Sequence, residues 1–231
     1  MNINITDLYG QDHEIDLDNL GNQAFCMDCM ELMKALPDKA FQLAVVDPPY
    51  GIGIDGNAES IDYKNPKHTR KGHKIKGWDS DIPAAEYFRE LERVSVNQII
   101  WGGNYFVEHL FSGHKGWVIW DKGQHGLTMS DCEIAYSSFD TPTRIIVLNR
   151  VELLLEGTIH PTQKPIKLYE QLLINYAHKG DRILDTHLGS QSSRIAAWQA
   201  EYDFLGCEID KDYYEQGCQR YESYAAQYRL C

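Results

Sequence analysis

The residues best suited to chemistry are four in a row, Asp47-Pro48-Pro49-Tyr50, which follow an apolar segment. The segment 41–46 has the composition of a buried strand, so Asp47 would stand at its carboxyl end, the edge where open α/β sheets bind ligands. Both prolines stiffen the turn and neither has an N–H, so the carbonyl groups of Asp47 and Pro48 can face a site. The run would therefore bring a carboxylate, two free carbonyls and an aromatic ring together.

This set of groups suits an aromatic amine whose lone pair is delocalised into its ring. Two acceptors that take its N–H bonds would favour the pyramidal geometry in which the lone pair is available, and Tyr50 would stack on a base turned out of its helix. Methyl transfer from a sulfonium then requires mainly alignment and electrostatic stabilisation. A rigid structural turn explains the same four residues equally well, so the run alone does not decide the function.

A second cluster begins with the predicted strand Arg182–Asp185, continues through a turn at Gly189, and ends in a helix that opens near Ser192. Backbone N–H groups at such a turn and helix start can bind a cofactor. About twenty residues on, the strand Phe204–Glu208 ends in an acid, a spacing that suits a carboxylate binding the hydroxyls of a nucleoside ribose. The order of strand, turn, helix, strand and acid favours a site for a nucleoside cofactor.

The elements that must position these residues alternate between short apolar runs and amphipathic stretches, the pattern of a largely parallel sheet flanked by helices. The length of 231 residues suits one domain, residues 1–231. The predicted strands are Phe41–Asp47, Gln98–Gly102, Gly116–Asp121, Cys132–Ser137, Arg144–Leu148, Arg182–Asp185 and Phe204–Glu208. The predicted helices are Met27–Leu36, Ala84–Ser95, Tyr105–Leu110, Ile166–His178, Ser192–Glu201 and Lys211–Tyr224.

Residues 51–82 break this pattern, because they are rich in Gly, Lys and His and exceed the usual connection of about 4–6 residues. Within them, positions 63–78 hold basic side chains and no acid, although the whole chain has a net charge of −12. A local cationic segment on an acidic chain can neutralise phosphates, and a solvated loop is the alternative. The basic side chains are Lys64, Lys67, Arg70, Lys71, Lys74 and Lys76.

The composition also indicates the cellular compartment and whether a metal site is expected. No apolar run approaches the roughly 20 residues that a membrane span requires, and the start of the sequence lacks the features of a signal peptide, so we expect a cytoplasmic protein with no membrane partner. Only Cys26 and Cys29 form a Cys-x-x-Cys pair, whereas a structural zinc site usually draws on two such pairs. We therefore predict reduced thiols and no metal site.

The motifs and their order resemble the amino methyltransferases of DNA, in the permuted β group whose catalytic half precedes the cofactor half. Ile159-His160-Pro161-Thr162-Gln163-Lys164-Pro165 is similar to the family's segment before the cofactor half, and 100–106 to a segment that closes the target-base side. The resemblance spans roughly residues 22–222. It implies a three-layer, Rossmann-like α/β fold dependent on S-adenosylmethionine, with a mostly parallel seven-stranded sheet and helices on both faces.

The resemblance also assigns residues. It implies that Asp47 and Pro48, followed by Pro49, bind the target amino group and that Tyr50 stacks on the base. The implied cofactor contacts are Asp28 near the adenine, Glu208 on the ribose, and His160, Thr162, Gln163, Lys164, Asp185, His187, Gly189 and Ser190 on the methionine part.

The glycine motif departs from the family's Asp-Pro-Phe/Tyr-x-Gly-Ser-Gly-Thr-Thr. Thr186 and His187 are polar where the family has proline and an aromatic residue, and Gln191 replaces a glycine. A positive φ or a close approach to the cofactor at position 191 is therefore in question. We keep activity as the prediction because the acids and the His-Pro-Thr-Gln-Lys-Pro run match.

These expectations together predict a site-specific DNA methyltransferase that flips a base out of double-stranded DNA and transfers the methyl group in line. An Asp at the head of the tetrapeptide leans toward N6 of adenine in this family, with N4 of cytosine as the alternative. Methylation at C5 of cytosine is excluded, because it requires a cysteine nucleophile, typically in a Pro-Cys pair that is absent here. Two rival functions are a catalytically impaired relative that binds DNA or cofactor, and methylation of RNA or of a protein amide.

The sequence says least about how the protein would recognise its DNA target. Larger relatives carry a recognition domain where this chain has only residues 137–159, so the basic segment would perform much of the DNA engagement. The recognition site and any pairing with a restriction enzyme are not indicated, and a homodimer is a further candidate assembly. The small size would suit an orphan enzyme of phage type, by analogy.

Overall fold

The computed structural model describes residues 1–56, 75–110, 116–126, 130–149 and 151–228. Its centre is a sheet of eight strands in the order β3-β10-β9-β4-β5-β7-β6-β8. The bounds of these strands, in that order, are Asn22–Cys26, Asp203–Glu208, Arg182–Asp185, Phe41–Val46, Ser95–Trp101, Cys132–Ser137, Trp117–Asp121 and Arg144–Val147.

Only β7 of this sheet runs against its neighbours. It pairs antiparallel with β5 and β6, and every other pair in the sheet is parallel. The central strands are apolar almost throughout, as in β4, because parallel strands are covered on both faces. The carboxyl ends of β3, β10, β9, β4 and β5 consequently meet along one edge of the sheet.

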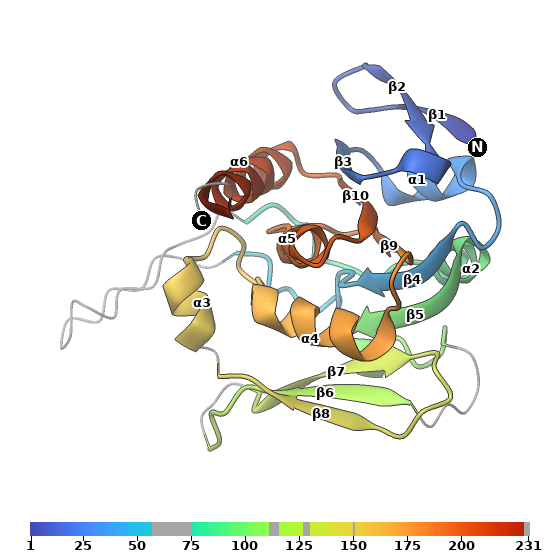
Figure 1. The fold of residues 1–231 in the computed structure, drawn as a ribbon. Helices are drawn as coiled ribbons and strands as arrows, with labels where there is room; N and C mark the ends of the chain where they lie inside the picture. Colours follow the sequence, from blue (N-terminus) through green and yellow to red (C-terminus); the bar gives the residue numbers. More distant parts are fainter. Residues whose placement is uncertain (57–74, 111–115, 127–129, 150, 229–231) are drawn as a thin grey trace.

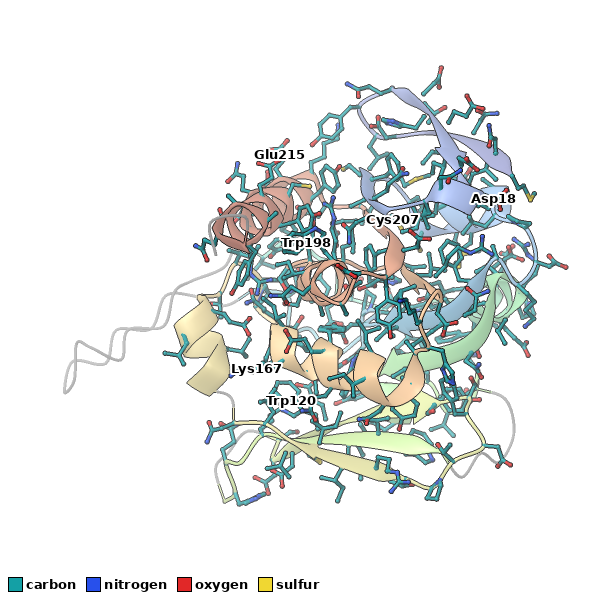
Figure 2. The ribbon with its side chains drawn as sticks, in the orientation of Figure 1. Asp18, Trp120, Lys167, Trp198, Cys207 and Glu215 are labelled. Atoms are coloured by element: carbon teal, nitrogen blue, oxygen red, sulfur yellow. The ribbon has the colours of Figure 1, made fainter. Side chains whose placement is uncertain are left out.

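Helices cover both faces (Figure 1). On one face lie α4 (Ile166–Tyr176), α5 (Ser192–Gln199) and α6 (Lys211–Tyr228), where Trp120 of β6 packs in the same core cluster as α4 (Figure 2). On the other face lie α1 (Cys29–Ala35) and α2 (Ala85–Val94), which share a core cluster with the hairpin β1 (Asn2–Thr6) and β2 (Asp12–Asp16). The short helix α3 (Val151–Glu156) follows β8.

All seven predicted strands are present, with ends shifted by up to three residues, but the sheet has an eighth strand, β3. The sequence of β3 contains only two buried apolar residues, Phe25 and Cys26, because β3 is an edge strand whose remaining side chains are partly exposed. The hairpin β1–β2 was also not predicted, because its outward positions carry Asn, Asp and Glu. Residues 137–159, expected to hold one strand and little else, also contain α3.

The predicted helix Tyr105–Leu110 is wrong. The chain instead forms a 3-10 turn over Gly103–Tyr105, and the N–H groups of His109 and Leu110 then both donate to the carbonyl of Phe106. The side chain of Phe106, in the middle of this segment, is fully buried in the core cluster that contains α2. Among the described residues, no helix combines the length and hydropathy needed to cross a bilayer.

Candidate functional site

Four acids follow four neighbouring strands at the carboxyl edge of the sheet. Asp28 follows β3, Glu208 ends β10, Asp185 ends β9, and Asp47 follows β4. Parallel pairing of these strands brings together residues that lie far apart in the sequence. The fold thus joins the predicted amine-binding turn and the predicted cofactor turn along one edge.

The tetrapeptide forms a tight polar group at that edge. The hydroxyl of Tyr50 donates to Oδ1 of Asp47 at 2.6 Å, and the ammonium of Lys164 donates to Oδ2 at 2.5 Å. The ring of Tyr50 stacks on that of Tyr105, with centroids 5.0 Å apart. Gly102 has φ +73°, and a Cβ there would lie 2.2 Å from the Tyr50 ring, so glycine is required for the ring to take this place.

A buried carboxylate fixes the backbone of the turn. Oδ1 of Asp79 accepts the N–H groups of Tyr50 at 2.7 Å and of Gly51 at 2.9 Å, and Oδ2 accepts that of Ile54 at 2.8 Å. Asp79 is only 1% exposed. Nothing in the local sequence distinguishes it from the exposed Asp81, so sequence reasoning missed it.

Asp55 performs the matching role at the other end of the segment. Its Oδ2 accepts the N–H groups of Lys76 at 2.8 Å and Trp78 at 3.1 Å, and also that of Gly77. The two aspartates together hold the stretches on either side of residues 57–74. We call this pair the Asp55/Asp79 clamp.

The predicted DNA contacts fall mostly in that interval. Lys64, Lys67, Arg70, Lys71 and Lys74 lie outside the described residues. Lys76 is described, and its ammonium contacts Asp210 at 2.5 Å and Asp212 at 2.8 Å, beside the start of α6. Its charge is therefore used within the protein, so Lys76 acts as an anchor of the segment rather than as a free cation.

Lys164, expected to bind the cofactor, contacts the turn that begins at Asp47. Its ammonium lies between Asp47 and Glu133, 3.1 Å from the latter, and Glu133 also pairs with Lys122 at 2.8 Å. Burial would lower the pKa of Lys164, but the two carboxylates outweigh it and raise that pKa. Burial raises the pKa of Asp47 despite the opposing charge of Lys164.

In the rest of the His-Pro-Thr-Gln-Lys-Pro run, His160 lies at the glycine turn and contacts Thr162, and Gln163 bonds to the backbone of its own segment. The ring of His160 lies 3.6 Å from where a Cβ on Gly189 would stand, so this side chain reaches the glycine turn. Thr162 contacts Nδ1 of His160 at 3.1 Å. Gln163 is buried and bonds to the backbone of Gly157 and Ile159, which makes it a support of the segment.

The glycine turn is linked to both strand-end acids. The N–H of Gly189 donates to Glu208 at 2.8 Å, and Asp185 accepts from the hydroxyl of Ser193 at 2.5 Å and from the N–H of His187 at 2.9 Å. Burial raises the pKa of Asp185 to about 7 and also raises that of Glu208. Ser190, buried in the turn, contacts the hydroxyl of Ser192.

The two polar departures from the family motif have partners inside the fold. The hydroxyl of Thr186 lies 2.7 Å from that of Tyr87 on α2 and 3.0 Å from Nδ1 of His187. Burial lowers the pKa of His187 to about 4, so its ring is neutral near pH 7. Tyr87 was not expected at the site; it supplies a hydrogen bond that a Pro-aromatic pair would not need.

Gln191 keeps the backbone conformation that favours glycine, with φ +60°. Its side chain turns toward α6, where Nε2 donates to the carbonyl of Tyr214 and Oε1 accepts from Arg194. A Cβ on Gly217 would lie 2.7 Å from Cγ of Gln191, so the space for this side chain comes from a glycine on α6. The doubt about a positive φ at position 191 is thereby resolved, because the turn is retained.

Asp28 caps the first turn of α1 by accepting the N–H groups of Met30 at 2.7 Å and Glu31 at 3.3 Å. It stands beside Glu208, whose carbonyl accepts the N–H of Met27. This acid was predicted within the helix and lies at its N-cap instead. Cys26 and Cys29 are free thiols, and the described residues contain no group of three or more potential metal ligands.

Comparison with known proteins gives a consistent result. A family model described as DNA methylase matches residues 143–219. The type II methyltransferase M.HhaII of Haemophilus parahaemolyticus is 25% identical over 209 residues, covering 79% of this chain and 89% of that protein.

Solved structures share the fold. The M1.HpyAVI–SAM complex has a TM-score of 0.57 at 18% identity, covering 86% of this chain and 98% of that one. The PvuII cytosine-N4-specific DNA methyltransferase has a TM-score of 0.56 at 12% identity, covering 90% and 92%. The expected three-layer α/β methyltransferase fold is confirmed, with eight strands in place of seven. The DNA methylase model over residues 143–219 and the similarity to M.HhaII agree with the family that the sequence motifs resemble, the amino methyltransferases of DNA.

Proposed function

We propose that this chain transfers a methyl group from S-adenosylmethionine to the exocyclic amino nitrogen of a DNA base. The observation that carries the proposal is the pairing of β4 with β9, which sets Asp47 next to the turn that begins at Asp185. A target amine on one turn and a methyl donor on the other would then meet at the same sheet edge.

The polar groups of the second turn fit such a donor. Glu208 is a partly buried carboxylate that accepts the N–H of Gly189, and burial raises its pKa. Hydroxyl donors that bind the carboxylate would favour its charged form. We propose that Glu208 binds the ribose hydroxyls, that Asp28 lies by the adenine, and that His160 and Gly189 border the methionine part. The bound cofactor would supply a methyl group on a sulfonium.

On the target side, the residues of this chain bind and orient the amine. Oδ1 of Asp47 accepts a hydrogen bond from Tyr50 and would accept one from the amine instead when a base enters. The methylated amine would carry a positive charge until it loses a proton, and Asp47, which would already accept one of its N–H groups, is placed to accept that proton. Because burial raises the pKa of Asp47, this carboxylate is suited to take that proton.

We propose N6 of adenine as the target atom, because Asp heads the tetrapeptide. N4 of cytosine is the second candidate, since a cytosine-N4-specific enzyme shares the fold. Incubation of unmethylated DNA with labelled cofactor, followed by mass spectrometry of the nucleosides, separates the two products. Parallel incubations with RNA and with protein test the other acceptor classes.

A folded protein that binds the cofactor in calorimetry but labels none of these acceptors would overturn the proposal. That outcome would favour a catalytically impaired binding relative. A labelled RNA or protein sample beside unlabelled DNA would move the function to that acceptor. N4-methylcytosine as the product would keep the enzyme class and replace the base.

We further propose that Lys64, Lys67, Arg70, Lys71 and Lys74, within the segment 63–78, bind DNA through their charges. Replacing Lys67, Arg70, Lys71 and Lys74 together by Gln should weaken DNA binding and flatten its dependence on salt, because fewer counterions are released. A filter-binding series over salt concentration measures this slope. A slope equal to that of the unchanged protein would refute the assignment.

A further inference from the structure

Four side chains of alternating charge lead from the catalytic turn to the end of β6. Asp47 contacts Lys164 at 2.5 Å, Lys164 contacts Glu133 at 3.1 Å, and Glu133 contacts Lys122 at 2.8 Å. They come from four separate parts of the chain, which only the folded sheet brings together. We call this set the charge chain.

Burial makes the charge chain interdependent. The side chain of Lys164 is 1% exposed, and those of Lys122, Asp47 and Glu133 are 10%, 15% and 25% exposed. A buried charge without a partner is strongly unfavourable, so the loss of any one charge alters the state of its neighbours. The two carboxylates balance the two ammonium groups.

Aromatic rings restrict where the ammonium groups can lie. Nζ of Lys164 is 5.3 Å from the centroid of the Trp101 ring and 5.6 Å from that of Tyr50, and Nζ of Lys122 is 5.4 Å from that of Trp120. Trp101 and Trp120 are buried and contact each other edge to face. Lys164 is thereby held where its charge is divided between Asp47 and Glu133.

We propose that Lys164 and Glu133 are positioning residues for methyl transfer, which act by setting the charge and the orientation of Asp47. Lys164 holds Oδ2 of Asp47 and keeps the carboxylate ionised, so that Oδ1 is presented to the target amine. Glu133 competes for Lys164 and thereby limits how tightly Asp47 is held. This inference rests on the proposed role of Asp47 as the acceptor of the amine.

The two residues act on Asp47 with opposite sign. The positive charge of Lys164 lowers the pKa of Asp47, and the negative charge of Glu133 raises it. Other groups also face Asp47. Tyr50 lies in the same turn, and the charge of Asp47 acts on Asp185 of β9 and Tyr169 of α4. Lys122 contacts Glu133 rather than Asp47. Changes confined to Lys164 or Glu133 leave all of these groups in place.

The test uses Lys164→Met and Glu133→Gln in the full chain. The single-turnover rate of DNA methylation is measured with labelled cofactor from about pH 5 to about pH 9, where carboxylates and His ionise. For Lys164→Met the rate at low pH should fall roughly tenfold relative to the rate at high pH, because Asp47 protonates more readily. For Glu133→Gln the acidic fall in rate should move the other way, to lower pH.

The matched controls are Lys34→Met and Glu31→Gln, which remove the exposed ion pair between these two residues on α1. Neither should change the pH profile. Lys164→Arg, which keeps the charge, should retain the profile of the unchanged protein even where its rate is lower. A merely structural role for Lys164 would lower the rate equally at every pH.

A readout independent of catalysis is the carbon NMR titration of the Asp47 carboxyl, assigned by its loss in Asp47→Asn. The midpoint should rise in Lys164→Met and fall in Glu133→Gln. Midpoints that do not move, or that move in the same direction, overturn the inference whether or not the protein methylates DNA. If Lys164→Met does not fold, the direction in Glu133→Gln decides alone. A protein that methylates no DNA but shows the expected midpoints would contradict the proposed function and still support the charge chain.

Discussion

The turns after β4 and β9 both begin with an aspartate at the carboxyl edge of the sheet, but the two carboxylates have different partners. Asp47 is paired with the ammonium of Lys164, whereas Asp185 accepts from the hydroxyl of Ser193 and the N–H of His187. Neutral donors compensate the burial of a charge less than an ion does, and the pKa of Asp185 is raised to about 7. Under the proposed function, the turn assigned to the amine holds its carboxylate with an ion, and the turn assigned to the cofactor holds its carboxylate with neutral hydrogen bonds.

The most direct test of this difference is to remove the carboxylate of Asp47. Asp47→Ala should abolish methylation while cofactor binding stays largely intact, because the carboxylate that binds the amine is lost and the glycine turn is untouched. Methylation assays and calorimetry with the cofactor measure the two effects separately. Retained methylation would refute the role of Asp47, and Asp81→Ala, at an exposed position, is the control.

The next largest effect concerns how the amine turn is held. Asp79→Asn should reduce the catalytic rate by about a hundredfold, since the amide cannot accept from three backbone N–H groups and the Tyr50 ring would shift. The catalytic rate should fall with cofactor affinity unchanged. An equal loss of cofactor affinity would show that the clamp supports both turns.

The Asp185 carboxyl should make the stability of the protein depend on pH. Its pKa in the folded state is raised from 3.8 to about 7, so the folded protein binds this proton more tightly than the unfolded chain does. The free energy of unfolding therefore falls, through this group, as the pH rises from about 4 to about 7, by on the order of 4 kcal/mol. Urea unfolding at about pH 5 and about pH 8 should show that Asp185→Asn loses this component. An identical pH dependence in both proteins would contradict it.

The smallest effect tests the shape of the cofactor turn. Gly217→Ala should lower the free energy of unfolding by about 1–3 kcal/mol, because the new methyl group meets the side chain of Gln191. In a Gln191→Gly background the same change should be neutral or stabilising, since alanine favours a helix by about 1 kcal/mol over glycine. A double-mutant cycle by denaturant unfolding gives the coupling. Additive effects would mean that Gln191 and Gly217 do not share space.

Features with a local signature were predictable from the sequence. The tetrapeptide with Asp47, the strand that ends at Asp185 and the acid Glu208 are set by apolar runs and short spacings, and the structure places all three at one edge. The family resemblance added the order of the two halves. The edge strand β3 was not predicted because its side chains are mostly polar or small.

Other parts of the site could not be read from the sequence because their partners are remote. Asp79 lies 29 positions from Tyr50, and Glu133 meets Lys164 only through the pairing of β7. Lys164 was assigned by its motif to the cofactor, yet its long side chain reaches the neighbouring turn. Contacts of this kind depend on the packing of the sheet, which no short spacing encodes.

The Asp55/Asp79 clamp acts on the backbone alone. Its carboxylates accept the N–H groups of residues such as Ile54 and Lys76, so these contacts do not depend on which side chains those residues carry. A substitution at Ile54 or Lys76 that leaves the backbone path unchanged therefore keeps both hydrogen bonds. The path of the chain around Tyr50 is in this way insulated from the side chains beside it.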